Sequence, residues 1–103
     1  QNANHEQAFL MLEDSSAQVR AAAALALGQM GHYGASFADY LGARVESTSG
    51  DIEVRRAAAR AIGNLGALAS SQAATLERCL GDAIAAGENA DIELIAAVCV
   101  ALG

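Results

Sequence analysis

The chain contains one segment three times, and this repetition limits what it can fold into. The segment reads SAQVRAAAALALGQMG at residues 16–31, DIEVRRAAARAIGNLG at residues 51–66 and DIELIAAVCVALG at residues 91–103. The copies are offset by 35 and then 40 residues, a period typical of stacked helical repeats. One such repeat cannot bury its apolar face alone, so successive repeats must stack into a continuous core. The repetition therefore predicts an all-α solenoid.

Apolar residues three and four apart predict that each copy is a helix. The shared apolar face of the first two copies comprises Val19, Ala22, Ala23, Ala26, Leu27 and Met30, and then Val54, Ala57, Ala58, Ala61, Ile62 and Leu65. Ala59 lies about 100° from Ala58 on the helical wheel, so we expect it to face away from the core. We expect the copies to begin at N-caps Ser16, Asp51 and Asp91, and the first two to end at Gly31 and Gly66.

The segments between the copies should supply the first helix of each pair, at residues 3–13, 35–47 and 69–86. We therefore predict an α-solenoid of three stacked antiparallel helix pairs in one domain, 1–103, with repeats at about 3–31, 35–66 and 69–103. Because Gln1 is not an initiator methionine, we expect the chain to be part of a longer solenoid or to dock in an assembly.

Composition excludes several classes of function. The chain holds 26 alanines, no proline and no lysine, and its net charge is −6 with every positive charge on arginine. Such a chain lacks the clustered cations of a nucleic-acid binder. No apolar stretch reaches the roughly 18 residues of a membrane span. Cys79 and Cys99 are too few for a disulfide framework, so we expect both to be small buried hydrophobes in an intracellular, reducing compartment.

The first repeat resembles the HEAT-like repeats, in particular the short alanine-rich variety of phycobilisome-lyase-type proteins. The matching residues are Leu12, Asp14, Val19, Arg20, Ala22, Ala23, Leu27, Gly28, Met30 and Gly31. The resemblance implies an inter-repeat ladder in which Asp14 and Arg20 take part and Arg55 receives Asp14 or Asp51. Ile95 replaces this arginine in the third copy, so the ladder should end there.

Two arginines of the second copy are candidates for binding a partner. Arg56 and Arg60 lie four residues apart, opposite the core face of their helix. The resemblance places second helices on the concave surface, where a planar guanidinium fork could receive an acidic segment of a partner protein. The alternative is a solvated face on which Glu53 pairs with these arginines within the helix.

The third copy is apolar on every side, which is typical of a helix buried all round. Ala96, Cys99 and Val100 occupy the positions of Arg56, Ala59 and Arg60. We expect Ile95, Cys99 and Val100 to contact a partner, or further sequence of the same chain to cover them. We also expect the isolated polypeptide to self-associate or aggregate.

These observations favour a non-catalytic protein–protein interaction scaffold or a structural subunit of a larger assembly, without a cofactor. The resemblance alone supports an alternative, a lyase-like or chaperone-like helper that seats a chromophore on an acceptor protein. His5-Glu6 raises a second alternative, because deoxyhypusine hydroxylase is also built from HEAT-like repeats and holds two irons with several His-Glu pairs. One such pair cannot assemble a dinuclear site, so we expect no metal and no enzymatic activity.

Overall fold

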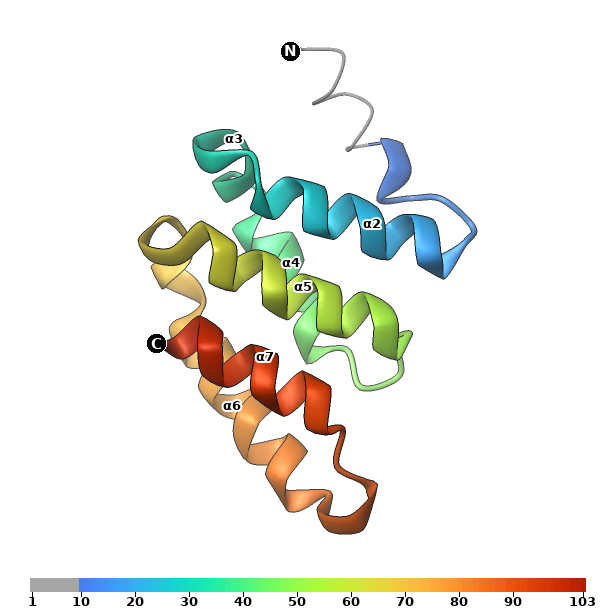
Figure 1. Ribbon diagram of the computed structural model, residues 1–103, viewed down its shortest axis with the longest axis vertical. Coiled ribbons are helices and arrows are strands. Elements are labelled where there is room, and N and C mark those ends of the chain that lie inside the picture. Colours follow the sequence, from blue (N-terminus) through green and yellow to red (C-terminus); the bar gives the residue numbers. More distant parts are fainter. Residues whose placement is uncertain (1–9) are drawn as a thin grey trace.

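A computed structural model describes residues 10–103, and all the regular structure in this range is helical (Figure 1). The helices are α2 (Ala17–Gly28), α3 (Gly31–Ala35), α4 (Ala38–Glu46), α5 (Ile52–Leu65), α6 (Ala73–Ala85) and α7 (Ile92–Leu102), with 3₁₀ segments η1 (Gly66–Gln72) and η2 (Gly87–Asn89). The three copies of the repeated segment form α2, α5 and α7. The helix expected at residues 3–13 lies largely outside the described residues.

The helices form two layers (Figure 1). α2, α5 and α7 lie side by side and run in the same direction, whereas α4 and α6 lie behind them. α5 occupies the middle and contacts α2, α4 and α7, and the third repeat is closed by contacts between α6 and α7. The expected all-α stack is confirmed for the part of the chain that the structure describes.

The three expected N-caps begin the second helices, and Gly66 ends α5 as expected. The expectation for Gly31 was wrong, because α2 ends at Gly28 and Gly31 begins α3. The Ser16 hydroxyl accepts a hydrogen bond from the Val19 amide at 3.4 Å, and the Asp51 and Asp91 carboxylates accept from amides in the first turns of α5 and α7. Each bond satisfies a donor that the helix leaves unpaired. Gly31 and Gly66 have φ angles of 55° and 58°, a left-handed backbone that glycine adopts without steric cost.

The connecting segments are less regular than predicted. The helix expected at residues 35–47 is α4, but a short helix that was not predicted, α3, precedes it. The helix expected at 69–86 begins as the 3₁₀ segment η1 and continues as α6. α3 starts at once because Gly31 turns the chain, and Gly34 then lies against the main-chain carbonyl of Leu27 with no room for a side chain. The tight turn therefore ends one helix and begins the next within three residues.

The core is built mainly from small side chains. All six residues predicted for the apolar face of α5 are buried. On α2, Ala23 and Leu27 are buried as predicted, but Ala22 is exposed, and the expectation for Ala22 was wrong. Ala59 is fully buried, so its predicted outward orientation was also wrong. A helix with neighbours on both flanks and behind it has only a narrow free side, and a wheel of one helix does not include those neighbours.

Glycine brings the second helices into close contact. A Cβ atom added at Gly28 would lie 2.7 Å from the Cα atom of Ala61 on α5. The equivalent glycine of the second repeat, Gly63, faces Ala101 on α7, and a Cβ there would lie 3.5 Å from the Ala101 Cα atom. The first distance is too short for any side chain, whereas the second is an ordinary van der Waals contact.

A buried amide links the first helices. The Gln72 side chain is buried, donates a 2.8 Å hydrogen bond to the Asp39 carboxylate on α4, and fills the space beside Gly42. A Cβ atom at Gly42 would overlap the Gln72 Oε1 atom. The bond satisfies a polar group that would otherwise be costly to bury, and it joins the second repeat to η1 of the third.

Ala59→Asp should destabilise the protein as severely as Ala58→Asp, by about 3–5 kcal/mol, because each buries an unpaired carboxylate at a fully buried position. Urea denaturation followed by circular dichroism measures both. Ala74→Asp, at an exposed position in the first turn of α6, is the matched control and should change stability by less than about 0.5 kcal/mol. A mild effect of Ala59→Asp would contradict the packing described here.

Gly28→Ala should lower the free energy of unfolding by about 1–3 kcal/mol, because the new methyl group meets backbone that cannot move independently. Gly63→Ala tests the equivalent position, where the methyl group fits. It should raise stability by up to about 1 kcal/mol, since alanine is the better helix former. Thermal or urea unfolding of both variants tests this difference. Changes of the same sign in their unfolding free energies would refute the close approach of α2 to α5 at Gly28.

Candidate protein-interaction surface

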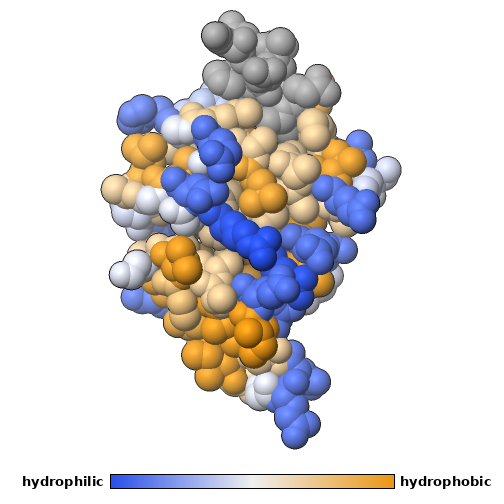
Figure 2. Space-filling view, in the orientation of Figure 1, coloured by the Kyte–Doolittle hydropathy of each residue, from blue (hydrophilic) through white to orange (hydrophobic). Residues whose placement is uncertain are grey.

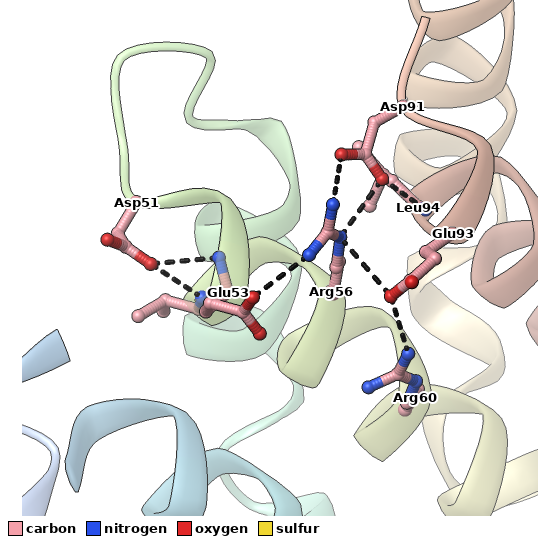
Figure 3. A network of polar contacts seen from close by, with 8 residues as sticks. Asp51, Glu53, Arg56, Arg60, Asp91, Glu93 and Leu94 are labelled. Atoms are coloured by element: carbon pink, nitrogen blue, oxygen red, sulfur yellow. Dashed lines mark hydrogen bonds and ion pairs between the residues drawn. The ribbon is translucent and has the colours of Figure 1, made fainter. Parts of the chain in front are cut away.

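An ion pair joins α5 to α7 through two parallel hydrogen bonds (Figure 3). Arg56 donates from Nε to Oδ1 of Asp91 at 3.0 Å and from Nη2 to Oδ2 at 2.5 Å. Asp91 is also the N-cap of α7, because its Oδ1 accepts the Leu94 amide at 2.8 Å. The hydrogen bond from Arg56 lowers the pKa of the Asp91 carboxyl below its usual value. One carboxylate thus caps a helix and binds the preceding repeat.

Further carboxylates surround the Arg56 guanidinium. Glu53 contacts Nη1 at 3.0 Å, and Glu93 lies 3.7 Å from Nε (Figure 3). The Arg56 side chain is only 19% exposed, and the hydrogen bond with Asp91 raises its pKa further. Arg56 was predicted to receive a partner's acidic segment. The structure instead satisfies it with acidic residues of this chain, so Arg56 joins two repeats.

Arg60 is the more accessible of the two candidate arginines. Its side chain is 48% exposed, and its ion pair with Glu93 is long, 3.5 Å from Nη2 to Oε1. It belongs to a groove of about 410 Å³ that crosses all three second helices. The groove is lined by Leu25, Arg60, Gly63, Asn64, Glu93, Ala96, Ala97 and Val100. Figure 2 shows polar side chains across the middle of this face and hydrophobic ones below them, over the region of α7.

The predicted ladder residues contact main-chain carbonyls. Arg20 donates to the carbonyl oxygens of Asp14 at 2.8 Å and Ser15 at 3.2 Å, and the Asp14 carboxylate accepts the Ser16 amide. Arg55 donates to the carbonyl oxygen of Val45 at 3.0 Å. Arg20 and Arg55 therefore fasten the turn before α2 and the end of α4. The expectation that Arg55 receives Asp14 or Asp51 was wrong.

Asp91 is the residue that sequence reasoning missed as a partner for Arg56. A signal was present, because Asp91 lies 35 residues beyond Arg56, at the start of the next second helix. The corresponding residues between the first two repeats are Ala21 and Asp51, which cannot form an ion pair. In the layer of first helices, a further ion pair between repeats joins Arg78 of α6 to Glu46 of α4 at 2.7 Å.

The third repeat exposes part of its apolar helix. Val100 is 76% exposed and Cys99 is also exposed, whereas Ile95 is half-buried. The expectation that Cys99 is buried was wrong, since no further helix covers it in residues 10–103. Cys79 is buried as predicted, and burial raises the pKa of its thiol.

His5 and Glu6 lie outside the described residues. Within residues 10–103, no group of three or more histidine, cysteine and carboxylate side chains is placed to hold a metal ion. None of the helices in this range combines the length and the apolar character that crossing a membrane requires.

The sequence model of a known family, described as HEAT repeats, matches residues 7–96. No curated protein and no solved structure matches the chain.

Asp91→Asn should lower the urea midpoint at pH 7, because asparagine keeps the N-cap but loses the charge that binds Arg56. The lowered pKa of Asp91 contributes stability above its unfolded value of about 3.9, and this contribution is lost as pH falls through the folded value. The variant should therefore lose less stability than the wild type below about pH 4.

Asp51→Asn is the matched control for Asp91→Asn. Asp51 caps α5 through the Glu53 and Val54 amides and occupies the same repeat position. Because asparagine caps equally well, this substitution should change the urea midpoint less than Asp91→Asn does. Equal shifts for both variants would show that the ion pair contributes nothing to the stack.

Proposed function

We propose that this chain, which belongs to the HEAT-repeat family, is a non-catalytic scaffold that binds another protein along its second helices. HEAT repeats generally mediate protein–protein interaction. The observation that carries the proposal is the groove across α2, α5 and α7, because it joins all three repeats into one continuous recognition surface. Repeat proteins commonly use such extended surfaces for binding.

The groove combines an apolar lining with one accessible cation. Leu25, Ala96 and Val100 line it with aliphatic groups, and Arg60 lies among them with a weakly held guanidinium. A carboxylate can bind this fork through two hydrogen bonds, whereas aliphatic side chains of the same segment fill the apolar part. The partner is therefore a protein segment that carries an acidic residue next to aliphatic ones.

The two neighbouring arginines have different roles in this proposal. Arg56 is engaged with Asp91 at hydrogen-bond distance on two atoms, so displacing it would break the contact between repeats. Arg60 exchanges only its long contact with Glu93 when a partner carboxylate approaches. Binding through Arg60 therefore leaves the stack intact. As a subunit of a larger assembly, the chain would present this surface without rearrangement.

A display library of random 15-residue peptides, selected against the whole chain, tests the proposal. Enriched peptides should contain aspartate or glutamate beside aliphatic residues. Arg60→Glu should weaken their binding at least about tenfold in isothermal titration, because it replaces attraction by like-charge repulsion. Arg78→Glu, at an exposed arginine on α6 outside the groove, should leave the affinity within about twofold. Enriched peptides that bind Arg60→Glu as tightly as the wild type would refute the proposed surface.

A further inference from the structure

Equivalent positions of the three second helices differ in burial. Ala24 and Ala59 are buried, whereas Cys99, at the same repeat position, is exposed. The glycines at another shared position differ in the same way. Gly28 faces Ala61 and Gly63 faces Ala101 of the next repeat, whereas a Cβ atom at Gly103 would meet nothing within 4 Å. The side of α7 that points away from α5 is therefore the side that the next repeat covers in the two preceding units.

The layer of first helices shows the same difference. The segments 40–45 and 79–84 correspond, as YLGARV and CLGDAI. Val45 is fully buried, but its counterpart Ile84 is 59% exposed. Gln72 fills the space beside Gly42, whereas a Cβ atom at Gly81 would meet nothing within 4 Å. Both layers of the third repeat therefore leave their outer side uncovered.

On each second helix, one side faces toward the following repeat. On α7 the residues of this side resemble those of α2 more closely than those of α5. The positions concerned carry Ala21, Ala24, Leu25 and Gly28 on α2, Arg56, Ala59, Arg60 and Gly63 on α5, and Ala96, Cys99, Val100 and Gly103 on α7. α2 and α7 thus present small and aliphatic residues there, and α5 presents two cations. A helix that fits α7 should resemble α5, the helix that packs on this side of α2.

A second copy of this chain offers such a helix. The side of α5 that includes Ala61, the residue against Gly28, reads Val54, Ala57, Ala58 and Ala61. α2 repeats this pattern as Val19, Ala22, Ala23 and Ala26, and there Ala22 is exposed while Val19 and Ala26 are half-buried. α2 contains one charged residue, Arg20, and α7 contains one of opposite sign, Glu93, so charge does not oppose their contact.

We propose that copies of this chain associate head to tail, with α7 of one copy packed on α2 of the next. In this contact α7 takes the place that α2 has within each copy, and α2 of the next copy takes the place of α5. Two different surfaces meet in such a contact, so it does not close on itself after two copies and can repeat. The contact borders the proposed groove at Ala96 and Val100, but Ala22 and Cys99, the positions at which it is tested, do not line that groove. Failure of one proposal therefore leaves the other standing.

Sedimentation velocity of the whole chain, in reducing buffer from about 2 to about 200 μM, tests the proposal. The wild type should form species that grow beyond dimers as concentration rises. Cys99→Glu blocks the α7 surface and Ala22→Glu blocks the α2 surface. Each should weaken self-association at least about 100-fold, because an unpaired charge is expensive to bury at an interface. Ala74→Glu, on exposed α6 surface, should associate as the wild type does.

Mixing the two blocked variants gives the most specific result. Each keeps one intact surface, so an equimolar mixture should form a dimer with one copy of each and stop there. Circular dichroism checks that both variants keep their helix content, and arginine at the same two positions supplies a second pair of variants. A wild type that stays monomeric throughout, one that stops at dimers, or a mixture that stays monomeric would overturn the proposal.

Discussion

Close contact between helix backbones, made possible by alanine and glycine, is the interaction on which the rest of the structure depends. Gly28 and Ala61 bring α2 and α5 together, and Gly63 and Ala101 repeat the arrangement between α5 and α7. Small side chains bury little apolar area each, so the stack relies on many short contacts between backbones and methyl groups. Because interaxial distance follows the side chains at the contact, a few alanine and glycine positions set the spacing of the three repeats.

This spacing also determines what the two arginines of α5 can do. It places Asp91 at the start of α7, within reach of both Nε and Nη2 of Arg56. One turn further along the helix, Arg60 pairs with Glu93 at the start of α7, at a longer distance, and stays half-exposed. Two residues of one type therefore have different roles, which their distances to one neighbouring helix decide. The groove proposed for recognition contains the arginine with the longer contact to the next repeat.

Features that depend on one helix alone were predictable from the sequence. The N-caps at Ser16, Asp51 and Asp91 and the terminal glycine Gly66 occur as local rules require. The burial of Ala59, the exposure of Ala22 and the pairing of Arg56 were not predicted, because each depends on a neighbouring repeat that a helical wheel omits. The short helix α3 before α4 was not predicted either, because it depends on the close contact between Gly34 and the Leu27 carbonyl. The position of Arg56 and Arg60 on one face of α5 was therefore predictable, but not the contacts that distinguish the two residues.

The contact between Gly42 and Gln72 has a consequence for how this sequence can diverge. The amide oxygen of Gln72 occupies the volume that any side chain at position 42 would need, and its nitrogen is held by Asp39. A larger residue at 42 would push the amide out of place and leave a buried polar group without its partner. The two positions, 30 residues apart, should therefore covary among relatives, with glycine at 42 wherever a long amide is present at 72 and a shorter residue at 72 wherever 42 gains a side chain.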